Sequence, residues 1–100
     1  MAQQPESPTV TAPEQTTVSS QTNYYFDIQT EGAELGAVRY YRIGNPNELS
    51  MQNFSVSTTE STTTWRGYQY SGGNTYAYSF AVLKDGVWSE WSSFIEITVQ

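Results

Sequence analysis

Residues 76–82 read Tyr76-Ala77-Tyr78-Ser79-Phe80-Ala81-Val82, a stretch in which large apolar side chains alternate with small ones. Because successive side chains of a β-strand point to opposite faces, this period of two predicts a strand with one strongly apolar face. Asp85-Gly86 follows, a dipeptide that favours a tight hairpin turn. The sequence therefore predicts a central antiparallel strand near the end of the chain.

The last residues repeat the same alternation, with Ile95 and Ile97 on one face and Glu96 on the other. We expect Tyr78 and Phe80 to lie inside with these isoleucines, because a slip of one residue would bury Glu96. We also expect the strand at 76–83 to pair with the last strand on one side and with a strand at 38–43 on the other.

Working outward, shorter alternating or β-branched stretches occupy the rest of the chain, separated by turns rich in Gly, Pro and Asn. The predicted strands cover residues 9–12, 23–30, 38–43, 54–57, 62–66, 76–83 and 95–99. This count and spacing predict a seven-stranded antiparallel β-sandwich of immunoglobulin-like type, with no helix of two turns or more. Residues 1–7 are expected to form a disordered leader, and residues 8–100 a single domain.

The composition excludes several classes of function. The chain has 100 residues, no Cys, no His, 4 Lys+Arg and 10 Asp+Glu, and a net charge of −6. It therefore has no disulfide framework, no thiolate or imidazole metal site and no histidine catalyst. Four scattered cations argue against a nucleic-acid partner, and no apolar run is long enough to span a membrane. The carboxylates form no catalytic pair or calcium loop, so we expect no enzymatic activity, cofactor or metal.

Residues 73–82 resemble strand F of a fibronectin type III domain. The resemblance implies that Tyr76 holds the tyrosine-corner position, where its hydroxyl bonds to nearby backbone. Trp88-Ser89-Glu90-Trp91-Ser92 matches the W-S-x-W-S signature of class I cytokine receptors, which precedes the last strand of their membrane-proximal fibronectin domain.

In those receptors, arginines on strand F stack between the tryptophans, because indole faces attract guanidinium groups. The outward positions of this strand are Ala77, Ser79, Ala81 and Leu83, and none is an arginine. Either Arg39 or Arg42 on the neighbouring strand supplies the cation, or the indoles rest on the small side chains of Ser79 and Ala81. We favour the second arrangement.

The aromatic residues indicate a candidate binding surface. Trp88 and Trp91 are interpreted first as a structural clamp on the last two strands, and second as part of an exposed binding surface. The other members of that surface are Arg39, Tyr41 and Tyr25. Tyr76 and Phe80 are predicted to be structural, together with Tyr24, Tyr40 and Tyr78, whereas Tyr68 and Tyr70 are expected to face outward.

The sequence thus predicts a non-catalytic module of an extracellular, cell-surface or virion-surface protein, acting as a spacer, adhesion or display domain. Its partner would be a surface glycan or protein, and the module would be monomeric. Two alternatives remain open: a carbohydrate-binding module of a secreted glycan-active protein, and a cytokine-receptor-like domain. Asn53-Phe54-Ser55 is an N-glycosylation sequon, and Trp88 begins a W-x-x-W pattern of the kind that is C-mannosylated.

Overall fold

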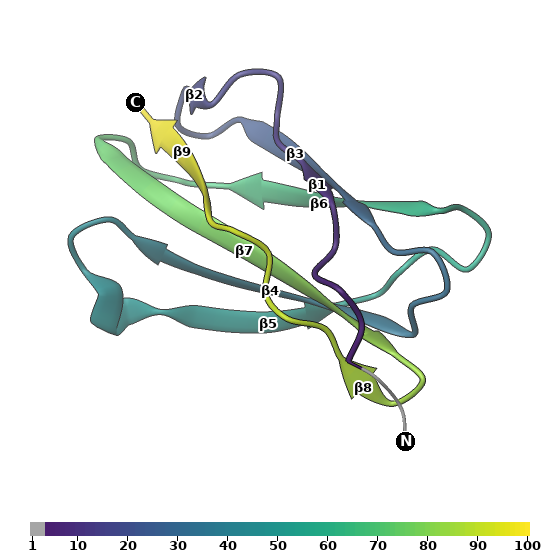
Figure 1. Ribbon diagram of the computed structural model, residues 1–100. Helices are drawn as coiled ribbons and strands as arrows, with labels where there is room; N and C mark the ends of the chain where they lie inside the picture. The colour runs from purple at the N-terminus through teal and green to yellow at the C-terminus, as the bar shows by residue number, and fades with distance from the viewer. Residues whose placement is uncertain (1–3) are drawn as a thin grey trace.

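The computed structural model describes residues 4–100 as two β-sheets packed face to face (Figure 1). The strands of this part of the chain are β1 (Val10–Thr11), β2 (Thr17–Val18), β3 (Asn23–Gln29), β4 (Leu35–Arg42), β5 (Ser50–Phe54), β6 (Thr62–Tyr68), β7 (Asn74–Lys84), β8 (Val87–Trp88) and β9 (Ile95–Val99). The predicted all-β sandwich is confirmed. The described strands number nine rather than seven, because β2 and β8 are two-residue strands that leave no periodicity in the sequence.

The strand order of the smaller sheet is β1-β3-β6, and that of the larger is β2-β9-β7-β4-β5, with β8 also paired to β7. Strand β7 pairs antiparallel with β4 and with β9, as the sequence predicts. One pairing differs from the expected antiparallel pattern, because β2 runs parallel to β9.

The N-terminal segment belongs to both sheets. Its first strand, β1, pairs with β3, and the next, β2, pairs with β9 of the opposite sheet. Pro13 lies between these two strands, in a short stretch without sheet pairing. Since proline has no N–H to donate, it suits a point where the chain leaves one sheet for the other.

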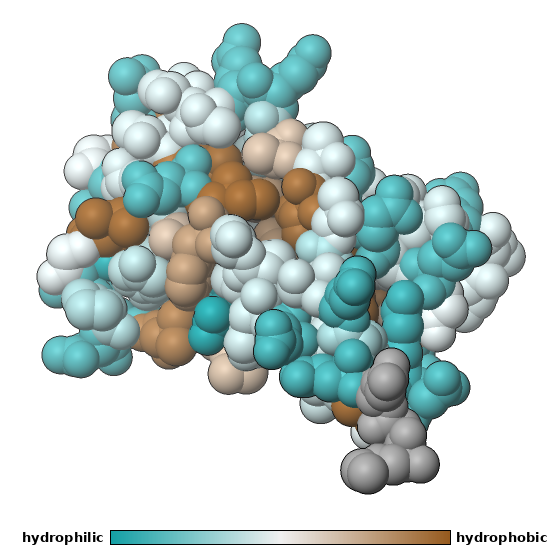
Figure 2. All heavy atoms as spheres, viewed as in Figure 1, coloured by the Kyte–Doolittle hydropathy of each residue, from teal (hydrophilic) through white to brown (hydrophobic). Residues whose placement is uncertain are grey.

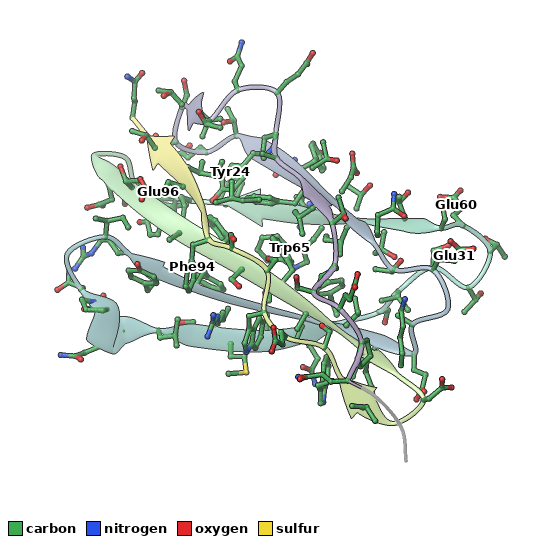
Figure 3. All side chains as sticks on the ribbon, viewed as in Figure 1. Tyr24, Glu31, Glu60, Trp65, Phe94 and Glu96 are labelled. Atoms are coloured by element: carbon green, nitrogen blue, oxygen red, sulfur yellow. The ribbon has the colours of Figure 1, made fainter. Side chains whose placement is uncertain are left out.

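The core lies between the sheets and is largely aromatic. Tyr24, Phe26 and Ile28 alternate with exposed residues along β3, the pattern of a strand with one buried face. Phe26 lies 5.1 Å from both Tyr78 and Phe80 of β7, measured between ring centroids. Trp65 of β6 fills the space between the sheets beside these rings (Figure 3).

The predicted register of β7 and β9 is confirmed. Tyr78, Phe80 and Ile97 are buried, Ile95 is partly buried against the core, and Glu96 is exposed. The hairpin at Asp85-Gly86 is confirmed as well, because both residues have a positive φ, of 50° and 76°. Two left-handed residues in sequence are the geometry of a type I′ turn, which suits the twist of a β-hairpin.

The largest differences from the predicted boundaries are in β4 and β5. Strand β4 starts at Leu35 rather than residue 38, because Gly36 and Ala37 are buried strand residues rather than loop. Strand β5 covers Ser50–Phe54 rather than 54–57, since its polar residues show no apolar alternation. The predicted leader at residues 1–7 lies partly outside the described residues.

Helical structure in residues 4–100 is limited to the three-residue 3-10 helix η1 (Pro46–Glu48). Within this part of the chain, no helix has the length and apolar character that crossing a membrane requires.

Candidate functional site

Residues 88–92, here called the Trp–Ser segment, run beside β7 between β8 and β9. Only Trp88 takes part in a strand, paired with Leu83, and the following residues form no regular ladder. They are nevertheless firmly hydrogen-bonded to β7. Ser89 N–H donates to the Val82 carbonyl at 2.8 Å, and Ser92 N–H donates to the Phe80 carbonyl at 2.8 Å.

The two serine hydroxyls complete this attachment. The Val82 N–H donates to Ser89 Oγ, and the Phe80 N–H donates to Ser92 Oγ, each at 2.9 Å. In a regular ladder a backbone carbonyl would accept these bonds. Here the segment advances three residues, from Ser89 to Ser92, while β7 advances two, from Val82 to Phe80. The backbone carbonyls therefore do not meet both N–H groups of β7, and the serine hydroxyls accept these bonds instead. The spacing of Ser89 and Ser92 therefore satisfies buried N–H groups that would otherwise lose a partner.

Trp91, on the same segment, contributes to a stack on the outer face of the larger sheet. The guanidinium carbon of Arg39 lies 4.6 Å from the Trp91 ring centroid and 4.8 Å from that of Phe94. Tyr41 meets Phe94 edge-on, with centroids 5.3 Å apart. We call these four residues the Arg39 stack; Figure 3 labels Phe94.

The position of Arg39 follows from the sheet register. Arg39 on β4 pairs with Ser79 on β7, and Ser79 is completely buried although its side chain is on the outer face of the sheet. Ser79 Oγ donates to the Ser92 carbonyl at 2.6 Å. Because Ser79 and Ala81 are small, Trp91 reaches across β7 to the cation on β4. The favoured expectation, indoles resting on Ser79 and Ala81 without a cation, is therefore corrected: Arg39 is the stacking partner of Trp91.

The five residues proposed as a binding surface do not all come together. Arg39, Tyr41 and Trp91 meet in one stack. Trp88 lies on β8, outside the stack, and is 37% exposed. Tyr25 lies on β3 of the opposite sheet and is 50% exposed. Phe94 is a member that the sequence analysis did not single out, although the alternation of the last strand places it on the same outward face as Glu96.

The hydrogen-bonded phenol of β7 is Tyr78 rather than Tyr76. The Tyr78 hydroxyl bonds to the Tyr24 hydroxyl and accepts from Gln69 Nε2 at 3.2 Å. Burial raises the pKa of both Tyr78 and Tyr24 above the usual range of phenols. Tyr76 is half-buried against the core, and within residues 4–100 its hydroxyl shows no hydrogen bond of the expected corner type. Phe80 lies in the core, with no exposed surface.

The Arg39 stack attaches the stretch from Trp91 to Phe94 to the outer face of the larger sheet. Its cation is held between two aromatic faces, and Arg39 Nε is buried without a hydrogen-bond partner in the described chain. No group of three or more metal-ligating side chains occurs among residues 4–100. On the face seen in Figure 2, apolar residues form separate groups among hydrophilic ones.

Comparisons with known proteins bear on the fold. No family model matches the chain, and no curated protein matches it in sequence. Among solved structures, the chain is similar to the crystal structure of chicken CNTN1 FN1–FN3 domains, with a TM-score of 0.63 and 16% identity. The match covers 96% of this chain and 33% of that one, so the chain spans about a third of its length. The fold is therefore a fibronectin type III-like β-sandwich.

Proposed function

We propose that this chain is a non-catalytic module of an extracellular or virion-surface protein, in which it acts as a spacer, adhesion or display domain. A fibronectin type III-like fold is typical of such modules. The observation that supports a spacer role most directly is the placement of the two ends of the domain. Gln4 Nε2 donates to the Trp88 carbonyl, next to Leu83 of β7, whereas Val99 pairs with Asn74 at the other end of β7.

Leu83 and Asn74 are nine residues apart on one strand. At a rise of roughly 3.3 Å per residue, the ends of the domain are about 30 Å apart. Figure 1 shows the described chain starting beside β8 and ending beyond β9. A module with this geometry adds length when it is inserted into a longer chain, which is what a spacer must do.

The pairing of β2 with β9 suits a domain that is pulled from its ends. The two strands are parallel, so a pull on both ends slides them past each other and loads their hydrogen bonds together. Three backbone bonds join this region: Thr98 N–H to the Thr16 carbonyl, Gln100 N–H to that of Val18, and Ser20 N–H to that of Gln100.

Single-molecule pulling from the two ends tests this role. We expect one cooperative unfolding step, and a lower unfolding force in Thr98→Pro, which removes the donor to Thr16. Glu96→Pro is the matched control: it lies on the same edge of β9, and its N–H has no backbone partner in the described chain. Stepwise unfolding at the lowest measurable force, or equal unfolding forces in both variants, would contradict a spacer that resists tension.

The cytokine-receptor alternative rests on the five-residue Trp–Ser segment alone. The resemblance implies cations from strand F, whereas here the cation that meets Trp91 comes from β4. The serine bonds to β7 account for the Trp–Ser segment as an element of stability. We therefore favour the spacer and display reading over a receptor.

A further inference from the structure

The side of the sandwich between β5 and β6 is open. Two adjoining cavities of about 350 and 160 Å³ lie along it, and both are lined by Tyr40, Tyr68 and Gln69. We call them together the β5–β6 cleft. Strand β5 places Ser50 opposite Tyr40 and Gln52 opposite Val38, so two of its inward positions carry small or polar side chains. Its third inward residue, Phe54, packs against Phe80 at the far end of the strand. Beside Ser50 and Gln52, the edge of the sandwich is therefore not filled by apolar residues as the middle is.

The floor of this cleft is aromatic. Tyr40 stacks on Tyr78 with ring centroids 5.4 Å apart and planes 30° from parallel, and it lies 6.4 Å from Trp65. Tyr68 lies at the mouth and is 46% exposed. These rings offer flat apolar surfaces with polar hydroxyl or N–H tips, a combination suited to ligands that are both ring-shaped and hydrophilic.

Polar groups held in place by neighbours line the rest of the cleft. Arg42 forms an ion pair with Glu48, with Nη2 and Oε2 3.6 Å apart. With its amide turned to accept, Asn45 also bonds Arg42 Nε and Nη2, at 3.0 and 2.7 Å. Gln69 is oriented by its bond to the Tyr78 hydroxyl. Side chains that are already oriented lose less freedom when a ligand binds, so the cleft is preorganised.

We propose that the β5–β6 cleft binds a neutral saccharide of two or more pyranose units. The C–H faces of a pyranose pack on aromatic rings, and its neighbouring hydroxyls match two-pronged partners such as guanidinium, carboxylate and amide groups. The larger cavity is within the size range of ligand pockets, and the smaller one extends it.

Other ligand classes fit less well. Arg42 is already engaged by Glu48 and Asn45, which leaves little charge for a phosphate. Glu48 is the single carboxylate among the residues that line the two cavities, too few for a metal ion. A proline-rich peptide would use the aromatic rings, but it has few hydroxyls to engage the amide and guanidinium groups. This inference goes beyond the spacer role, which neither requires nor excludes a ligand.

The test is a backbone and side-chain amide NMR titration with cellohexaose, xylohexaose, mannohexaose and chitohexaose, and separately with a polyproline peptide. We expect at least one oligosaccharide to shift the signals of Ser50, Gln52 and Gln69. Tyr68→Ala should weaken that binding by roughly tenfold or more, as loss of a central aromatic contact does. Tyr70→Ala is the matched control, because Tyr70 is 74% exposed, lies two residues away and lines neither cavity.

Three results would overturn the proposal. The first is no shift with any of the four oligosaccharides, and the second is shifts confined to Arg39, Trp91 and Phe94. The third is binding of the peptide alone, which would make the cleft a peptide site. Equal losses in Tyr68→Ala and Tyr70→Ala would likewise count against it. None of these results alters the unfolding force, so the spacer role stands or falls separately.

Discussion

The inner aromatic cluster and the Arg39 stack use similar rings in opposite settings. The inner cluster consists of Phe26, Trp65, Tyr78 and Phe80, whose ring centroids lie 5.1 to 6.0 Å apart between the sheets. The Arg39 stack has comparable ring spacings, but it lies on the outer face of one sheet and includes a cation. The inner rings hold two sheets together by excluding water. The outer rings hold one irregular segment to a strand, with help from serine hydroxyls.

The largest expected difference between the two regions comes from the same substitution made in each. Phe80→Ala leaves a cavity in the core and should lower the free energy of unfolding by about 3–5 kcal/mol. Phe94→Ala removes a ring that is 39% exposed and should cost much less. Urea denaturation of both variants measures this, and equal losses would show that the outer stack is as important to folding as the core.

The serine bonds of the Trp–Ser segment should matter nearly as much as a core contact. Ser89→Ala leaves the buried Val82 N–H without its acceptor, which should cost about 1–3 kcal/mol. Ser93→Ala is the control, since Ser93 is exposed and its hydroxyl bonds to nothing in the described chain. Thermal unfolding should separate the two, and a Ser89→Ala variant as stable as the control would mean that water replaces the hydroxyl.

The inner cluster should also respond to high pH. Burial raises the pKa of the Tyr78 and Tyr24 phenols, so the folded state keeps protons that the unfolded state loses above a pKa of about 10. Stability is therefore fully present below pH 10 and falls as the pH rises further, by up to about 1.4 kcal/mol per pH unit for each phenol. Tyr78→Phe should show a shallower fall in urea denaturation between pH 9 and 11.5, and an unchanged slope would contradict this coupling.

The smallest expected effect is the coupling within the Arg39 stack. In a double-mutant cycle, Arg39→Ala and Trp91→Ala should show an interaction of about 0.5–1 kcal/mol, the usual strength of a cation–π pair that is not fully buried. Arg39→Ala with Trp88→Ala serves as the reference cycle and should be additive, because Trp88 lies outside the stack. Additivity in both cycles would show that the contact between Arg39 and Trp91 contributes no measurable interaction free energy.

The strands that have one buried apolar face could be predicted from the sequence. The strands that are mostly exposed or very short could not be predicted. The alternation at β3 and β7 marks one buried face, so their positions and register followed directly. Strand β5 has four exposed residues out of five, and the burial that makes a sheet periodic is absent there. Strands β2 and β8 are too short to show any period.

The candidate site was only partly predictable for a related reason. The Trp–Ser motif marked residues 88–92, but its cation lies about 50 residues earlier, at Arg39. That contact depends on the register between β4 and β7, which the sequence pattern does not determine. The β5–β6 cleft forms because Ser50 and Gln52, rather than large apolar residues, occupy inward positions of β5. The local sequence pattern does not show that these positions face inward.

The N-terminal segment, shared between the two sheets, also protects their edges. Strand β1 covers the edge of β3, and β2 covers the edge of β9, so the nine residues 10–18 shield two rows of backbone hydrogen-bonding groups. Neither strand contributes a residue to the fully buried core. Proteolytic trimming of this segment would remove Val10 and Val18, which pack against the core, and would expose one free edge on each sheet. The trimmed domain would then be a template for edge-to-edge aggregation, so its solubility depends on this segment as well.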